Sequence, residues 1–166
     1  NYIEWYAQYI NWSTYNSSSA ATDDQFKLAF YKVDGETPDP GPGPVDPDAP
    51  IADGDQVVIY APAYGKALSS EKTGFYNVGT DVTLTDGVLS GYTAADIWTV
   101  VDNGDGTYSF QQDGQNIGLA DSYASMDLGA VNDAWEIIDL EDGTYNIKNT
   151  GRDNYMEWYA QYSNWS

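Results

Sequence analysis

The sequence contains no cysteine and no histidine, and only six of its 166 residues are lysine or arginine. Without cysteine, the chain can form no disulfide, present no thiolate nucleophile and bind no zinc through sulfur. Without histidine, it can carry neither a Ser-His-Asp triad nor a histidine metal cluster. We therefore predict no metal site and no cofactor.

The six basic residues are outnumbered by 26 acidic ones, which gives a formal net charge of −20 at pH 7. Such a charge repels the phosphates of nucleic acids and the anionic surface of a membrane. The apolar runs are too short to span a bilayer, and no basic-then-apolar signal peptide is visible. The sequence begins at Asn1 rather than Met, so we expect a mature protein or an excised fragment. We predict no nucleic-acid partner and no membrane insertion.

Aromatic residues make up 15% of the chain, which argues against a disordered acidic protein. A stretch rich in proline, glycine and acid, residues 34–50 (DGETPDPGPGPVDPDAP), divides the rest of the sequence. Proline fixes φ and lacks an N–H donor, so we interpret this stretch as an extended linker. The 33 residues before it are too few for a stable unit, whereas residues 51–166 can form a domain.

A 13-residue motif occurs twice. Residues 1–13 read NYIEWYAQYINWS and residues 154–166 read NYMEWYAQYSNWS, with differences only at Ile3/Met156 and Ile10/Ser163. This identity implies tandem copies of one unit. Residues 1–33 are then the tail of a preceding repeat. We predict that they pack as strands with the second module, either within one molecule or by exchange between molecules.

The local signals are almost all those of β-structure. Asp-Gly pairs at residues 53–54, 86–87, 105–106, 113–114 and 142–143 are each flanked by short β-branched or aromatic runs, which is typical of hairpins. A second repeat relates WTVVD followed by DGTYSF, which begins at Trp98, to WEIID followed by DGTYNI, which begins at Trp135. A fainter relative begins at Gly54. We predict an all-β fold, a β-trefoil-like or related small β-barrel or sandwich, in which the N-terminal segment completes the C-terminal module.

Two chemical interpretations of the acidic residues are weak. The segment from Asp102 to Gly106 suggests a calcium loop, but glycine occupies the third and fifth positions and no Glu stands at the twelfth. Glycosidase chemistry needs two carboxylates in different environments. Glu4 and Glu157 lie inside aromatic runs, but they occupy the same position of two copies and do not suggest a complementary pair. We predict that the protein is not an enzyme.

The repeated motif carries the main functional signal, because its two copies hold ten of the chain's 25 aromatic residues (6 Trp, 15 Tyr and 4 Phe). As a strand, the motif places Trp5 and Trp158 on its more apolar face, where a core role competes with a binding role. Rings with polar tips, interleaved with Gln and Asn amides, are the surface that a neutral sugar requires. The predicted stacking residues are Trp12, Trp165, Tyr9 and Tyr162, followed by Trp5, Trp158, Tyr6 and Tyr159. The predicted hydrogen-bonding residues are Gln8, Gln161, Asn11, Asn164, Glu4 and Glu157.

Three further strings accompany this motif: FKLAFYKV after the first copy, then GKALSS…GFYNVGTDVTL, and then GYTAADIW before the second copy. Together with EWYAQY-x-NWSTYN they resemble the starch-binding modules of secreted starch adherence (amylosome) proteins of gut anaerobes. The resemblance covers essentially the whole chain outside the linker. It implies a non-catalytic module of a secreted or cell-surface protein that holds α-1,4-glucan in an aromatic groove, as part of a larger multi-domain or dockerin-bearing assembly. The alternative is a structural or adhesion repeat of a bacterial surface protein.

Overall fold

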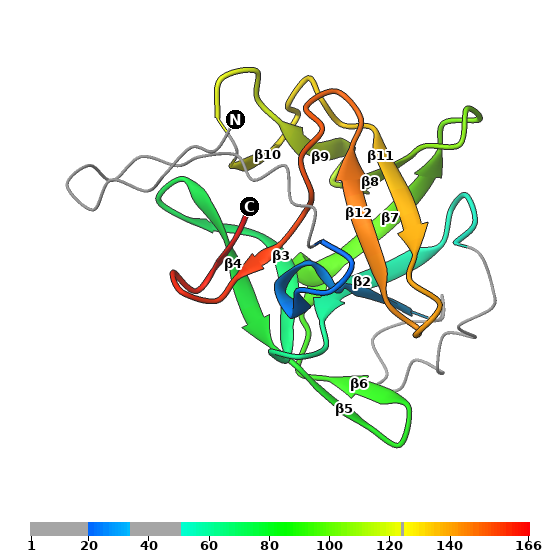
Figure 1. Ribbon diagram of the computed structural model, residues 1–166, viewed down its shortest axis with the longest axis vertical. Helices are drawn as coiled ribbons and strands as arrows, with labels where there is room; N and C mark the ends of the chain where they lie inside the picture. Colours follow the sequence, from blue (N-terminus) through cyan, green and yellow to red (C-terminus); the bar gives the residue numbers. More distant parts are fainter. Residues whose placement is uncertain (1–19, 34–50, 124) are drawn as a thin grey trace.

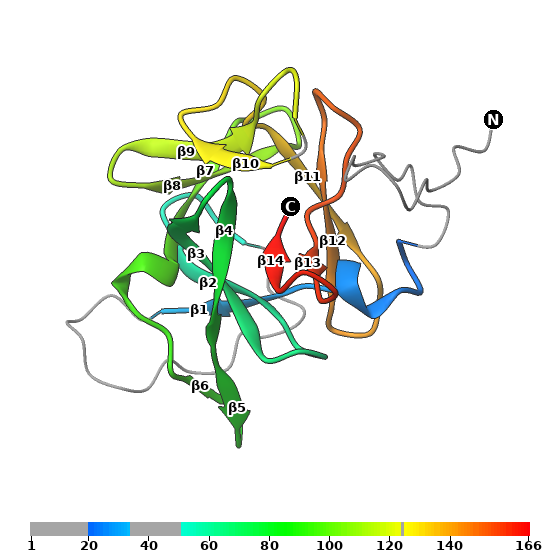
Figure 2. The ribbon, with the colours of Figure 1, turned by 90° about the vertical axis from the view of Figure 1, so that its left-hand side faces the viewer.

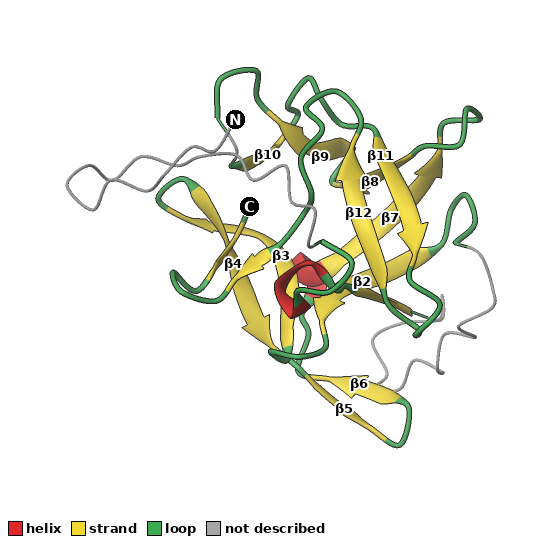
Figure 3. Ribbon diagram, in the orientation of Figure 1, coloured by secondary structure: helices red, strands yellow, loops and turns green. Residues whose placement is uncertain are grey.

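The computed structural model describes residues 20–33, 51–123 and 125–166. Across these ranges the chain is built from strands and two short 3-10 turns, and no α-helix occurs in them (Figure 3). All strand pairs in this part of the chain are antiparallel. The prediction of an all-β fold is confirmed.

Fourteen strands follow one another along the described chain (Figure 1). They are β1 (Ala29–Lys32), β2 (Gln56–Ala61), β3 (Lys66–Thr73), β4 (Tyr76–Asp81), β5 (Thr83–Thr85), β6 (Val88–Ser90), β7 (Ile97–Asp102), β8 (Tyr108–Gln112), β9 (Gln115–Leu119), β10 (Met126–Leu128), β11 (Trp135–Asp139), β12 (Tyr145–Asn149), β13 (Trp158–Tyr159) and β14 (Asn164–Trp165). The 3-10 turns are η1 (Asp24–Phe26) and η2 (Ala94–Asp96). The predicted strands around residues 57–60, 82–84, 98–101, 108–110 and 135–138 all form.

Three hairpins, β1–β2, β7–β8 and β11–β12, form the centre of the fold and share one register. Lys32, Asp102 and Asp139 lie opposite Val57, Tyr108 and Tyr145, respectively. Four residues earlier in each hairpin, Leu28, Trp98 and Trp135 pair with the neighbouring hairpin, at Tyr145, Val57 and Tyr108, respectively. The three hairpins therefore repeat one structural unit, which agrees with the repeat seen in the sequence.

These six strands follow one another in the order β1, β2, β7, β8, β11, β12, and β12 returns toward β1. The return is a single bridge, in which Leu28 and Tyr145 exchange two main-chain hydrogen bonds of 3.0 and 2.7 Å. A continuous ladder does not join β12 to β1 among the described residues. The architecture is therefore a strongly bent, sandwich-like sheet and not a closed barrel.

Three further hairpins, β3–β4, β9–β10 and β13–β14, lie on the left-hand side of this centre in Figure 1. Indole N–H groups of the centre bond to the first two of them. Trp98 donates to the carbonyl of Leu68 at 3.0 Å, and Trp135 donates to the carbonyl of Ile117 at 3.0 Å. Both tryptophans are fully buried, so their polar atoms need these acceptors.

The core consists of two clusters on opposite faces of the β1–β2 pair. Leu28 and Phe30 join the larger cluster with Trp98, Phe110, Trp135 and Ile147, whereas Ala29 and Tyr31 join the smaller one with Val58 and Leu89. Strand β1 is thus buried on both faces. It is part of the core, although it precedes the linker in the sequence.

The Asp-Gly pairs form turns where the sequence predicts them. Asp113 and Gly114 both have positive φ angles, 50° and 76°, as a type I′ hairpin requires. The β7–β8 and β11–β12 connections are three-residue loops that end in Gly106 and Gly143, whose φ angles are 88° and 82°. A left-handed glycine at that position matches the twist of the flanking strands, so Asp102–Gly106 is a hairpin loop.

Candidate functional site

The first copy of the repeated motif lies outside the described residues. It contains the predicted binding residues Glu4, Trp5, Tyr6, Gln8, Tyr9, Asn11 and Trp12, whose roles stay predictions. The second copy is described in full, so the candidate site is built from residues 154–166 and the segments around them.

The second copy folds as the small β13–β14 hairpin, with Trp158 opposite Trp165 and Tyr159 opposite Asn164. The chain turns through residues 160–163, and Ser163 has a φ of 53°. The motif is therefore two very short strands around a turn, and the prediction of one strand with a single alternating pattern is wrong for this copy. The turn separates Trp158 from Tyr162, which a continuous strand would place on the same face.

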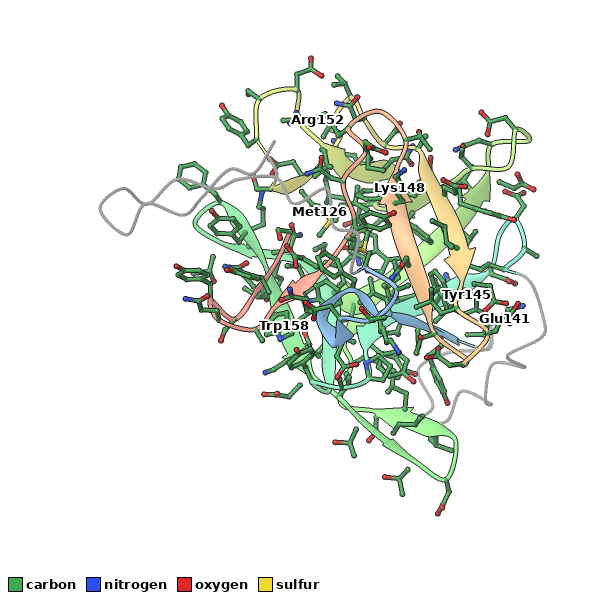
Figure 4. All side chains as sticks on the ribbon, viewed as in Figure 1. Met126, Glu141, Tyr145, Lys148, Arg152 and Trp158 are labelled. Carbon is green, nitrogen blue, oxygen red and sulfur yellow. The ribbon has the colours of Figure 1, made fainter. Side chains whose placement is uncertain are left out.

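The two tryptophans of this copy point into the core. Trp165 is fully buried and donates from Nε1 to the carbonyl of Ala67 at 3.1 Å, while Trp158 is 4% exposed. Their rings meet edge to face with centroids 5.7 Å apart, and Figure 4 labels Trp158 at this hairpin. The prediction that Trp158 and Trp165 stack on a sugar is wrong, because neither ring presents a face to solvent.

Glycine makes room for this packing. Gly79 on β4 lies under Trp158, so that an added Cβ would stand 2.6 Å from Cη2 of the indole. The ammonium group of Lys66 lies 5.7 Å from the centroid of the same ring. Trp158 thus packs against the backbone of Gly79 and lies near the Lys66 ammonium group, so its ring stabilises the fold.

The turn end of the hairpin carries two of the three tyrosines of this copy, Tyr159 and Tyr162. The rings of Tyr159 and Tyr162 stack with centroids 5.2 Å apart and an interplanar angle of 30°. Tyr162 is 43% exposed, and the Tyr159 hydroxyl donates to the side-chain oxygen of the exposed Gln161 at 3.2 Å. The Asn164 amide reaches the carbonyl of Tyr162 at 3.4 Å. The structure therefore brings together Tyr159, Gln161, Tyr162 and Asn164 of the predicted set.

Glu157, the remaining predicted residue, has an unusual environment. The pKa of its carboxyl is raised to about 7. Burial is the main cause and the Asp23 carboxylate adds to it, while the Ser166 hydroxyl partly offsets both by donating to Oε1 at 3.3 Å. Glu157 and Ser166 also exchange two main-chain hydrogen bonds, of 2.8 and 3.1 Å. Glu157 is thus a largely buried group beneath the hairpin, and it is not part of the exposed tyrosine pair.

Two exposed aromatics beside this hairpin are absent from the predicted set. Phe75 is 79% exposed at the β3–β4 turn, and Tyr123 is 63% exposed in the loop before β10. With Tyr162, each of the three hairpins β3–β4, β9–β10 and β13–β14 carries one exposed ring at its connecting loop. The available sequence signal is weak: an aromatic residue next to a turn, as in Thr73-Gly74-Phe75, where Gly74 has a φ of 64°.

The three loops lie on the same side of the molecule, on the left in Figure 1 and facing the viewer in Figure 2. Strand β14 pairs with β4 through Trp165 and Asn77. On the other flank, Lys72 of β3 donates to the Met126 carbonyl of β10 at 2.9 Å and forms an ion pair with Asp127. These contacts tie the hairpins that carry Phe75, Tyr123 and Tyr162 to one another, and we call the side of the molecule on which their loops lie the aromatic face.

The electrostatics of the surface are set by unpaired acids. Each of the five lysines forms an ion pair with an aspartate: Lys27–Asp142, Lys32–Asp55, Lys66–Asp81, Lys72–Asp127 and Lys148–Asp153. Arg152 donates to the Ala120 carbonyl at 2.5 Å. The excess acids are left without cationic partners among the described residues, which disfavours an anionic ligand on this surface.

Within residues 20–33, 51–123 and 125–166, no group of three or more His, Cys, Asp or Glu side chains is placed to hold a metal ion. In the same ranges, no helix is long and apolar enough to cross a membrane.

The sequence matches no protein-family model, and no curated protein matches it.

Proposed function

We propose that this protein is a non-catalytic carbohydrate-binding module that recognises a neutral polysaccharide through the aromatic face. The observation that carries the proposal is the stack of half-buried Tyr159 on exposed Tyr162 beside Gln161, with Phe75 and Tyr123 exposed on loops at the same side of the molecule. A pyranose has an apolar C–H face that packs on an aromatic ring, and its hydroxyls bond to amide and phenol groups. The face offers both kinds of contact.

Several rings on separate loops suit a polymer better than a single sugar. Each additional ring that engages the same chain converts a second binding event into an intramolecular one, which raises affinity without new chemistry. Of the neutral polysaccharides, we propose starch-type α-1,4-glucan, following the resemblance of the motif and its flanking strings to starch-binding modules. The same resemblance supports a secreted or cell-surface location within a larger multi-domain or dockerin-bearing protein.

Binding without catalysis is supported by the placement of the acids. Glu157 has a pKa of about 7, which suits a general acid, but its carboxyl is largely buried and accepts a hydrogen bond from Ser166. The exposed tyrosine pair and Gln161 supply stacking and hydrogen-bonding groups rather than a carboxylate pair. Incubation with maltooligosaccharides should therefore leave their length unchanged, as judged by chromatography.

The test compares single variants in affinity gels that contain starch, cellulose, xylan or mucin. Tyr162→Ala and Phe75→Ala should each reduce retardation by starch several-fold, because each removes a large aromatic contact surface, and stacking on such a ring contributes about 0.5–1.5 kcal/mol beyond the area that it buries. Leu84→Ala is the matched control, since Leu84 is 50% exposed on the β5–β6 hairpin, which projects away from the aromatic face (Figures 1 and 2). Unchanged retardation of both aromatic variants would refute the aromatic face as the site.

A structural or adhesion repeat is the second candidate, and one observation favours it. Both tryptophans of the second copy of the motif are core residues, which is the role expected of a residue repeated for folding. If none of the four polysaccharides retards the unmodified protein, this candidate replaces the first.

A further inference from the structure

Residues 20–33 lie along a groove between β2 and β12, and within them residues 28–31 are buried on both faces of the chain. Leu28 is fully buried, and Phe26, Phe30 and Tyr31 are each at most 6% exposed. Along one edge, β1 pairs with β2 over four residues, from Ala29–Tyr60 to Lys32–Val57. Along the other edge, Leu28 is bonded through its main chain to Tyr145 at the start of β12, near the turn that contains Glu141 (Figure 4). Removing this segment would uncover two strand edges and both core clusters.

Polar groups of the groove also recognise the segment. The amide nitrogen of Asn146, which is 3% exposed, donates to the carbonyls of Ala20 at 3.0 Å and Phe26 at 2.9 Å. Lys27 and Lys32 form ion pairs with Asp142 at 2.9 Å and Asp55 at 2.8 Å. The groove is therefore specific in sequence and register for residues 20–33, and does not accept any apolar strand equally well.

The connection between the segment and the rest of the sheet is far longer than the fold requires. The Val33 N–H donates to the Gln56 carbonyl at 2.7 Å and closes the loop end of the β1–β2 hairpin. The equivalent bonds of the other two central hairpins join Asn103 to Thr107 and Leu140 to Thr144, and each of them encloses a loop of three residues. The loop between Val33 and Gln56 instead consists of residues 34–55. Residues 34–50 contain six prolines and, when extended, 17 residues reach roughly 50 Å, so the same segment can reach the groove of another molecule.

The segment also crosses a boundary between repeats. In the sequence it follows the first copy of the 13-residue motif, but in space it packs on the second copy. The ring of Phe26 meets that of Tyr155 edge to face, with centroids 6.1 Å apart. The strand that follows one motif thus completes the sheet that contains the other. This is the arrangement of an exchanged strand.

We propose that the groove between β2 and β12 is an acceptor site for residues 20–33 of a second copy of this chain, so that copies join by strand exchange. The contacts in the exchanged and unexchanged forms are the same, because the donor segment and groove are identical. The balance between the forms is then set by the effective concentration that the connection imposes, and short flexible linkers in general impose values of the order of mM. Exchange therefore becomes substantial when the concentration of copies approaches that value.

The absence of cysteine from the chain permits a direct test. Lys32 and Val57 lie opposite each other in the β1–β2 pair, so Lys32→Cys in one chain and Val57→Cys in a differently tagged chain can form a disulfide only if β1 of the first pairs with β2 of the second. The two full-length variants are unfolded, mixed, refolded together at ~1 mM and at ~10 μM, and oxidised. The disulfide-linked heterodimer is then quantified on non-reducing gels.

Two matched controls accompany the pair. In the first, Glu71→Cys, an exposed position on β3, replaces Val57→Cys. In the second, residues 34–55 of both chains are replaced by Gly-Asp-Gly, the loop that joins Asn103 to Thr107. We expect the Lys32→Cys and Val57→Cys pair at ~1 mM to give about tenfold more heterodimer than either control, and much less at ~10 μM. A yield equal to that of the Glu71→Cys control, or an unchanged yield with the short loop, would overturn the proposal.

Discussion

Stability should depend on pH through Glu157. Its folded-state pKa of about 7 exceeds the ordinary value of 4.5, so the folded protein favours the protonated form. The corresponding stability is fully present below about pH 4.5 and is lost as the pH rises through about 7. A pKa difference of about 2.5, at about 1.36 kcal/mol per pH unit, limits the loss to about 3 kcal/mol. Much of it arises from burial beneath the β13–β14 hairpin and from the nearby Asp23.

The assay is urea unfolding of the unmodified protein and of Glu157→Gln at a series of pH values from about 4.5 to about 8.5. Glutamine keeps the shape of the protonated carboxyl and cannot ionise. The free energy of unfolding of Glu157→Gln, relative to the unmodified protein, should therefore rise by up to about 3 kcal/mol across this range. Glu71→Gln, which removes an exposed carboxylate, controls for the change in net charge. If the relative stability of Glu157→Gln changes by less than about 0.5 kcal/mol, the burial argument is refuted.

Two further variants test the packing around the hairpin. Trp165→Ala should reduce the free energy of unfolding, measured by urea denaturation, by about 3–5 kcal/mol. The substitution leaves a cavity at a fully buried site and removes the indole donor to the Ala67 carbonyl. A loss below about 1 kcal/mol would contradict the buried placement. Gly79→Ala should lower the melting temperature and reduce the free energy of unfolding by about 1–3 kcal/mol, because the new methyl group overlaps the Trp158 ring. The double variant Gly79→Ala, Trp158→Leu should recover part of this loss.

The turns and strands were predictable because their signals are local. An Asp-Gly pair between β-branched runs specifies a hairpin through the left-handed conformation of its glycine, and the positive φ angles at Gly87, Gly106, Gly114 and Gly143 agree with this. The internal repeat around Trp98 and Trp135 likewise predicted two equivalent hairpins, because repeated sequence produces repeated structure.

The orientation of the motif's aromatic residues could not be predicted in the same way. Trp165 is buried because β14 pairs with β4 at Asn77, a contact between residues distant in the sequence, and because Ala67 supplies an acceptor for its indole. Tyr162 is exposed because the chain turns at Ser163. Phe75 and Tyr123 were missed for the same reason: each stands alone in its own string, and only the assembly of three hairpins brings them to the side where Tyr162 lies.

The long connection between β1 and β2 replaces a three-residue hairpin loop, which has a thermodynamic consequence. The entropy of closing a flexible loop grows only with the logarithm of its length, so lengthening the loop from three residues to the 22 of residues 34–55 costs about 2 kcal/mol. Further residues would add only tenths of a kcal/mol each time the loop grew by a few positions. The sheet therefore tolerates almost any insertion here, and this position is the natural place to graft a foreign domain into the fold without disturbing the aromatic face.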